Sequence, residues 1–173
     1  KNKNEVEMAI SNIKDKKFSI TDISSKIINR NPSGPFTTST LQQVASSRLG
    51  FGASRTMQIA QRLYQGIEID GETIGLITYM RTDGTNLSVD AVSTFRDYIK
   101  NEFGNDYLPE SSLNYSGKKA KNAQEAHEAI RPTDVKRSPQ NVKKYLSSDQ
   151  NKLYSLIWSR ALSSQMETAQ FDR

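Results

Sequence analysis

The chain has 173 residues, no cysteine and a formal net charge of +5. The lack of cysteine excludes disulfides, thiolate metal sites and a cysteine nucleophile. No apolar run approaches the roughly 18 residues of a membrane-spanning helix, so we expect no membrane partner. The lack of cysteine is consistent with a cytoplasmic protein but does not require one. The basic balance suits a polyanion partner such as nucleic acid, but it does not require one. Because the chain starts at Lys1 without a methionine, we expect a piece of a longer protein.

The first 36 residues predict short elements and then a boundary. Asn4 and Glu7 have the spacing of a helix N-terminus, and apolar residues at 6, 9, 10 and 13 share one helical face. Phe18 and Ile20 alternate with polar neighbours, which favours a strand. Two prolines and a glycine in the stretch 29–36 indicate the clearest boundary in the chain.

Two helices are predicted after this boundary. Apolar residues from Leu41 to Leu49 form a stripe that Gly50 ends, and Ser54 is expected to cap a second helix that ends at Gly66. The second helix carries polar side chains on its other face, namely Arg55, Gln58, Gln61 and Arg62. Two short helices with a tight glycine turn resemble a helix-turn-helix, although any αα-hairpin has this pattern.

A β-hairpin is predicted over residues 67–80. Ile67 and Ile69 alternate with acidic residues, and Asp70-Gly71 is a favoured two-residue turn. The second strand would run into Tyr79.

Helices account for most of the rest of the chain. Ser88 is expected to cap a helix that ends at Gly104, and residues 104–122 read as a polar loop. A short helix at 122–130, another from Ser138-Pro139 and a last one over 149–166 follow. The final residues, 168–173, look like a strand without its partner. The predicted fold class is therefore mainly α with small β elements.

Tyr79, Arg81 and Asp83 stand at alternate positions. In an extended segment such side chains share one face, and the Cα atoms of Tyr79 and Arg81 would lie roughly 7 Å apart. Ionising a free tyrosine at pH 7 costs roughly 4 kcal/mol, and one arginine at that separation supplies about 2.4 kcal/mol at a dielectric of 20. Arg81 alone would not activate Tyr79. A nucleophile with a phosphate clamp and an ordinary surface strand both remain open.

The single histidine lies in a charged segment. His127 and Arg131 are four residues apart, so on a helix they would share a face and could bind a phosphate. A surface helix with ordinary ion pairs explains the same residues. The sequence shows no convincing metal site, since Glu68, Asp70 and Glu72 straddle the expected hairpin turn.

Three stretches together carry a resemblance to a known family. They read PFTTSTLQQVASSRLGFGASRTMQIAQRLYQG at 35–66, GLITYMRTDGTNLS at 75–88 and AQEAHEAIRPTD at 123–134. Their residues and their order closely resemble the motifs of type IA topoisomerases of the bacterial topoisomerase I branch. Met80 and HEAIRP favour that branch over the related topoisomerase III proteins.

The resemblance implies a chemistry and an assignment of residues. Tyr79 matches the family's nucleophile, which becomes joined to the 5′ phosphate of single-stranded DNA while another strand passes through the break. Arg81 matches the residue held against the cleaved phosphate, and His127 matches a histidine near the catalytic region. Thr82 and Asp83 belong to the same motif. The expected supporting or DNA-binding residues also include Arg131, Arg55 and Arg62.

The resemblance also implies a division of the chain and of the cofactors. Residues 37–166 would be the helical domain that bears the tyrosine, whereas 1–36 and 167–173 would be ends of an arch that joins it to the rest. Mg²⁺ would be bound by an acidic domain absent from this chain, and no ATP is needed. The partners would be a single-stranded segment of negatively supercoiled DNA and the remaining domains of the polypeptide, in the bacterial nucleoid.

Two other functions remain open on the sequence. The chain could be a non-catalytic helix-turn-helix module that binds DNA, or a structural domain with incidental basicity. If the family assignment holds, we expect the isolated chain to fold and bind DNA weakly but not to relax it.

Overall fold

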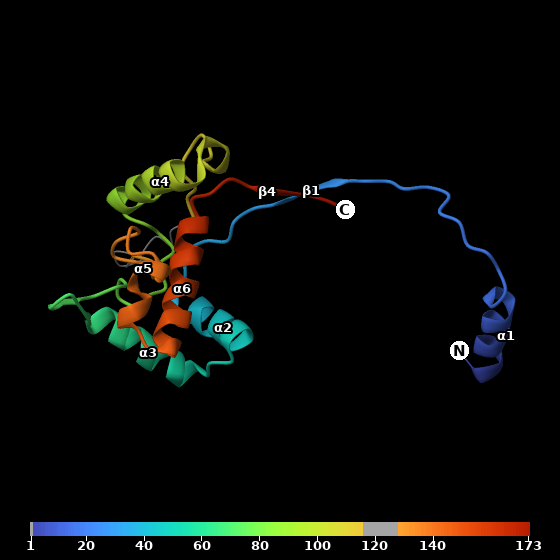
Figure 1. Ribbon diagram of the computed structural model, residues 1–173, viewed down its shortest axis with the longest axis horizontal. Helices are drawn as coiled ribbons and strands as arrows, with labels where there is room; N and C mark the ends of the chain where they lie inside the picture. The colour runs from blue at the N-terminus through green and yellow to red at the C-terminus, as the bar shows by residue number, and fades with distance from the viewer. Residues whose placement is uncertain (1, 116–127) are drawn as a thin grey trace, which may run out of the picture. The chain divides into compact units, whose positions relative to one another are not determined.

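A computed structural model describes residues 2–115 and 128–173 of the chain. Two compact units are present: Lys1–Ile28 with Gln170–Arg173, and Asn29–Ala169. Most of the secondary structure is helical and the strands are short, as Figure 1 shows, so the prediction of a mainly α fold with small β elements is confirmed. No helix in these described ranges is long and apolar enough to cross a membrane.

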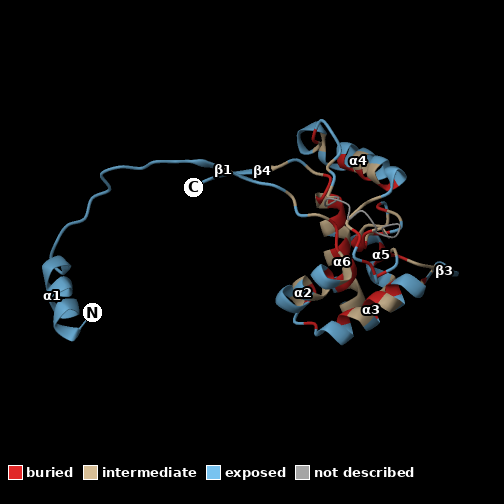
Figure 2. Cartoon of the chain, turned by 180° about the vertical axis from the view of Figure 1, so that it is seen from behind, coloured by how far each residue is buried: buried red, intermediate tan, exposed pale blue. Residues whose placement is uncertain are grey.

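The smaller unit holds the first helix, α1 (Lys3–Ile13). Its capping box is formed by Asn2 and Glu5, so the cap lies two residues before the predicted cap Asn4. All residues of α1 are exposed, as the pale blue helix in Figure 2 shows. The strand expected around Phe18 and Ile20 is wrong, because these residues have no strand partner and are exposed.

Two strands that are distant in the sequence pair in a two-stranded sheet. It is built from β1 (Ile27–Arg30) and β4 (Ala169–Asp172). Next to the strands, Lys26 and Arg173 exchange backbone hydrogen bonds of 2.9 and 3.1 Å. The expectation of a final strand without a partner is therefore wrong, since β1 supplies the partner.

The core of the larger unit lies where α2 (Thr38–Leu49), α3 (Ala53–Gln65) and α6 (Ser148–Ser163) pack together. Figure 2 shows the buried side of α6 and α3 in red at this junction. Leu41, Leu63 and Ile157 are among its fully buried side chains. A second cluster joins α4 (Val89–Phe103) to the end of α6 through Phe95, Ile99 and Leu162.

The connection between α2 and α3 matches the sequence prediction at the end of α2 but not at the start of α3. Gly50 follows α2 with φ of 67°, a left-handed conformation in which glycine carries no side-chain penalty. The cap of α3 is Gly52 and not Ser54, so the helix begins one residue before the predicted cap. The connection is therefore only 50–52, which holds the two helices close together.

The hairpin exists but is shorter than predicted. It pairs β2 (Ile67–Ile69) with β3 (Glu72–Ile74), and the turn residues Asp70 and Gly71 both have positive φ as expected. The second strand ends at Ile74 and does not continue to residue 80. The reason lies in the next residues, because Leu76 donates its N–H to the Leu63 carbonyl at 2.8 Å instead of pairing with β2.

The caps predicted for α4 and α5 (Pro139–Val142) are present, whereas α6 begins at Ser148 after its cap Ser147 and ends at Ser163, three residues before the predicted end. Ser88 caps α4, which Gly104 ends, and the short helix α5 begins after Ser138. Two single turns, η1 (Asn105–Tyr107) and η2 (Lys143–Tyr145), complete the elements. Of the helix expected at 122–130, residues 122–127 lie outside the described ranges. Residues 128–130 are not helical, because Ile130 forms an antiparallel bridge with Phe36.

Candidate active site

The segment that follows the hairpin presents alternate side chains to solvent. Tyr79, Arg81 and Asp83 are exposed, whereas Met80 and Thr82 between them are buried. Tyr79 has a relative solvent exposure of 45%, which is high for an aromatic residue next to a core. The alternation therefore puts a phenol, a guanidinium and a carboxylate on the outer side of one short segment.

A threonine at the start of α2 holds this segment from one side. The Thr38 hydroxyl donates to the carbonyls of Met80 at 2.8 Å and Thr82 at 3.1 Å, and it accepts the Thr82 N–H at 2.8 Å. The Thr38 N–H also donates to the Thr82 carbonyl at 2.9 Å. These contacts fix the backbone on both sides of Arg81, so its side chain extends from a fixed main-chain position.

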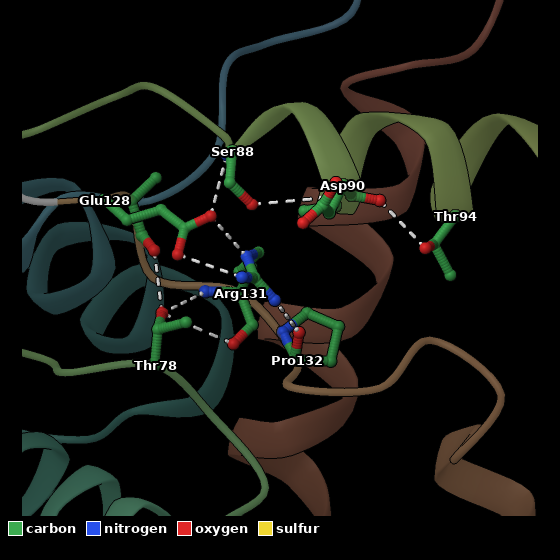
Figure 3. A network of polar contacts seen from close by, with 9 residues as sticks. Thr78, Ser88, Asp90, Thr94, Glu128, Arg131 and Pro132 are labelled. Atoms are coloured by element: carbon green, nitrogen blue, oxygen red, sulfur yellow. Dashed lines mark hydrogen bonds and ion pairs between the residues drawn. The ribbon is translucent and has the colours of Figure 1, made fainter.

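A second threonine holds the segment immediately before Tyr79. The Thr78 hydroxyl donates to the Ala129 carbonyl at 2.7 Å and accepts the Arg131 N–H at 3.0 Å, and the Thr78 N–H donates to the Arg131 carbonyl at 2.9 Å (Figure 3). The main chain is thus attached to the 129–131 stretch at Thr78 and to α2 at Met80. Tyr79 lies between the two attachment points.

The ring of Tyr79 has an aromatic neighbour in the last turn of α3. Tyr64 packs edge-on against it, with ring centroids 5.3 Å apart and an interplanar angle of 64°. The close approach of the segment before Tyr79 to the end of α3 depends on Gly75, because a Cβ there would lie 2.7 Å from the Tyr64 carbonyl oxygen. The chain between β3 and Tyr79 therefore lies directly against the end of α3.

Arg131 is engaged within the protein. Its guanidinium makes a two-point contact with the Glu128 carboxylate, at 2.7 and 2.9 Å, and donates to the Pro132 carbonyl (Figure 3). The Ser88 N–H donates to the same carboxylate at 2.8 Å. Burial acts to raise the pKa of Glu128, but these hydrogen bonds outweigh it and hold the pKa below its usual value. The pair joins the 128–132 stretch to the start of α4.

A shallow hollow of about 440 Å³ opens beside Arg81. Its walls come from two elements, the start of α2 and the segment 81–83; they are Thr37, Thr38, Ser39, Arg81, Thr82 and Asp83. Arg81 provides permanent positive charge there, and N–H groups at a helix start also favour anions. Asp83 lies at the same hollow with the opposite charge, so the site is not uniformly basic.

The candidate DNA-facing residues of α3 differ in their surroundings. Arg55 forms an ion pair with Asp149 of α6, and its guanidinium lies 4.7 Å from the centre of the Phe51 ring. Arg62 is exposed in the last turn of α3. Both side chains remain on the outer surface, where a phosphate could reach them.

His127 lies outside the described residues, so its predicted role stays a prediction. Within the described ranges, no three acidic or histidine side chains are close enough together to hold a metal ion. Thr38, Thr78 and Tyr64 are absent from the residues that the sequence singled out for the site. Their partners are far away along the chain, and only the polar run at 37–40 hinted that this stretch had a special part.

A family model described as DNA topoisomerase matches residues 1–173, the whole chain. This chain belongs to the DNA topoisomerase family. DNA topoisomerase 1 of Rickettsia typhi is 50% identical over 171 residues, which cover 99% of this chain and 22% of that protein. DNA topoisomerase 1 of Xylella fastidiosa is 54% identical over 148 residues, 85% of this chain and 18% of that protein.

A solved structure supports the same assignment. The full-length topoisomerase I of Thermotoga maritima matches with a TM-score of 0.73 and 46% identity, over 86% of this chain and 23% of that chain. The predicted family is therefore confirmed. The chain spans about a fifth of the length of these relatives.

Proposed function

We propose that this chain is the tyrosine-bearing part of a type IA DNA topoisomerase, with Tyr79 as its nucleophile. The observation that carries the proposal is the position of Tyr79. Its phenol is exposed on a segment whose backbone is hydrogen-bonded on one side through Thr78 and on the other through Thr38. A nucleophile that must meet a phosphodiester bond in one geometry benefits from such a fixed base.

The proposed reaction exchanges one phosphate ester for another. The Tyr79 oxygen attacks the phosphorus of a DNA phosphodiester, forms a bond to the 5′ phosphate and releases the 3′ oxygen. The phenol gives up a proton, and the 3′-hydroxyl that leaves gains one. The 3′-hydroxyl later attacks the phosphotyrosine and restores both starting groups. Because the ester bond is kept throughout, the cycle needs no ATP.

Arg81 is the proposed clamp on the cleaved phosphate. Its side chain lies on the same exposed side of the segment as that of Tyr79. A planar guanidinium can donate two hydrogen bonds to phosphate oxygens. Asp83 would help orient Arg81 or the substrate, and His127 and Thr82 would support the site. The substrate would be a single-stranded segment of negatively supercoiled DNA in the bacterial cytoplasm.

Other parts of the polypeptide would complete the site. Since one arginine does not supply the energy needed to ionise a tyrosine at neutral pH, further cations are required. We propose that they come from a domain that the relatives possess beyond this region, with Mg²⁺ bound there. The described residues of this chain offer no grouped ligands for Mg²⁺.

The test uses a chimera, in which this chain replaces the matching segment of the Rickettsia typhi relative. Single-strand cleavage is measured as covalent protein–oligonucleotide adduct after denaturation, alongside relaxation of supercoiled plasmid. Tyr79→Phe should abolish the adduct and leave oligonucleotide binding intact. Tyr145→Phe, which removes a phenol oxygen bonded to Asp70, is the matched control. Adduct formation by the Tyr79→Phe protein would sink the proposal.

A non-catalytic DNA-binding module is the second candidate. It is favoured by the exposed polar face of α3, where Arg55, Gln58 and Arg62 point outward beside a tight helix connection. This candidate predicts that Tyr79→Phe changes nothing, whereas Arg62→Gln weakens binding. The 173-residue chain by itself is expected to bind oligonucleotides and leave plasmid supercoils unchanged under either function.

A further inference from the structure

Three hollows follow one another along α2, from its first residues to Arg48 in its last turn. The first is the hollow at Arg81. The second, of about 370 Å³, shares Thr37 with it. The third, of about 510 Å³, lies between α2 and α6 and shares Ser33, Val44 and Arg160 with the second. Neighbouring hollows with common walls form a path that leads away from the candidate active site.

Arg160 stands where the second and third hollows meet. It belongs to the last turn of α6, and its guanidinium carbon lies 4.7 Å from the centre of the buried Phe36 ring. A guanidinium over an aromatic face is attracted by the ring. The charge is therefore held in place at the junction by packing.

Arg48 brings a second positive charge to the third hollow. It lies in the last turn of α2, and both arginines line the same walls. In the described part of the chain, neither Arg48 nor Arg160 forms a salt bridge. Burial and the charge of Arg48 both lower the pKa of Arg160. The charged residues that line this hollow are Arg30, Arg48 and Arg160 against Glu167 alone, so its net charge is positive and an anion is a favourable occupant.

The rest of the third hollow is largely apolar. Val44 and Leu156 come from α2 and α6, Met166 follows α6, and Tyr107 adds an aromatic ring that is about half exposed. Glu167 also lines it and contributes one negative charge, and its carboxylate accepts the Thr168 N–H at 2.8 Å. Cations beside an apolar and aromatic wall are the combination that single-stranded nucleic acid uses, phosphate on one and base on the other.

We propose that the hollow between α2 and α6 is a second contact for single-stranded DNA. Arg48 and Arg160 would bind a backbone phosphate, and a neighbouring base would lie against Tyr107 and Leu156. The inference rests on the proposed function, which makes DNA the polyanion, and extends it from the Tyr79 region to the opposite end of α2. The linked hollows give the strand its route.

The test measures binding of fluorescein-labelled oligothymidylate to the 173-residue chain by anisotropy, over a series of salt concentrations. Arg48→Gln should weaken binding about tenfold, the loss expected for one charge-assisted contact. It should also reduce the salt slope by about 0.7, as one phosphate contact on a single strand does. Lys152→Gln is the matched control, since it removes one exposed positive charge from α6 outside the hollow.

Further variants separate the phosphate from the base. Arg160→Lys keeps the charge and should weaken binding less than Arg160→Gln, with circular dichroism confirming that both fold. Tyr107→Ser should weaken binding of oligothymidylate but not of an abasic oligomer with the same phosphates. Equal effects of Arg48→Gln and Lys152→Gln would overturn the site. Tighter Arg48-dependent binding of oligouridylate than of oligothymidylate would overturn the assignment to DNA.

The outcome is independent of the chemistry at Tyr79. Tyr79→Phe should bind as the unmodified chain does, because anisotropy does not require cleavage. Loss of binding in Arg48→Gln without any Tyr79-dependent adduct in the chimera would leave the hollow as a DNA site and end the nucleophile proposal. A Tyr79-dependent adduct with unchanged binding in Arg48→Gln would end the inference about the hollow alone.

Discussion

The ring of Tyr64 packs edge-on against the ring of Tyr79, with centroids 5.3 Å apart. Such aromatic pairs contribute about 0.5–1.5 kcal/mol beyond the area they bury. In this structure the contact links the last turn of α3 to the proposed nucleophile. Tyr64 therefore limits where the phenol of Tyr79 can turn, even though both rings are partly exposed.

The first prediction concerns this contact. Tyr64→Ala should lower the rate of adduct formation in the chimera about fivefold, in line with the loss of roughly 1 kcal/mol of positioning. Tyr64→Phe keeps the ring and should cleave at nearly the unmodified rate. Oligonucleotide affinity should stay the same in both, which separates positioning from binding. An equal loss in the Phe and Ala variants would show that the ring contact is not what matters.

The second prediction concerns the Thr38 hydroxyl. Thr38→Val leaves the buried Thr82 N–H without its acceptor, and removes the donor to the Met80 and Thr82 carbonyls. An unsatisfied buried group costs about 1–3 kcal/mol, so the free energy of unfolding in urea should fall by about 2 kcal/mol. Thr38→Ser restores the hydroxyl and should recover most of the loss. A Val variant as stable as the Ser variant would contradict the role given to these hydrogen bonds.

The sequence predicts those parts of the fold that a few adjacent residues decide. Gly50 ends α2 in a left-handed conformation, Asp70-Gly71 makes the hairpin turn and Ser88 caps α4, all as expected. Each depends on backbone conformations or cap contacts within three or four residues. The placement of Tyr79 and Arg81 on one exposed side also follows from alternation alone.

The rest of the site depends on contacts between distant residues. Thr38 meets Thr82 across 44 positions, and Thr78 meets Ala129 across 51. No periodicity in the chain encodes such pairs. The shortened hairpin has the same cause, because Gly75 docks on the Tyr64 carbonyl and draws the chain away from β2. Alternation along the chain therefore predicts which side chains of the segment 79–83 are exposed, but not the hydrogen bonds that hold this segment in place.

The third prediction is a pH dependence of stability that comes from Glu128. The pKa of its carboxyl is held below the ordinary value of 4.5, so the folded state binds fewer protons than the unfolded state between the two values. Its stabilisation is fully present above about pH 4.5 and is lost as the pH falls through the lower folded-state pKa. Glu128→Gln should cost on the order of 1–2 kcal/mol at pH 7, and this difference should shrink in acid.

The control for this prediction is Glu68→Gln, an exposed carboxylate on β2. Urea unfolding of the three proteins between pH 3 and pH 7 gives the comparison. The fall in the free energy of unfolding at acid pH should become smaller in the Glu128 variant only. A difference between Glu128→Gln and the unmodified chain that stays constant over this range would show that the Arg131 pair does not carry the pH dependence.

The fourth prediction concerns the contact that shapes the approach to Tyr79. Gly75→Ala would put a Cβ 2.7 Å from the Tyr64 carbonyl oxygen, and neither backbone can give way cheaply. We expect a loss of about 1–3 kcal/mol in the free energy of unfolding, as overpacking typically causes. Gly52→Ala meets no atom within 4 Å at a φ of −63°, so it should cost only the preference for glycine over alanine at the N-cap of α3, about 0.5–1 kcal/mol. Because Gly75 leads into the segment that carries Tyr79, adduct formation in the chimera should fall with Gly75→Ala even at temperatures where the protein is fully folded. Unchanged cleavage by a folded Gly75→Ala protein would show that the segment keeps its geometry without this close approach.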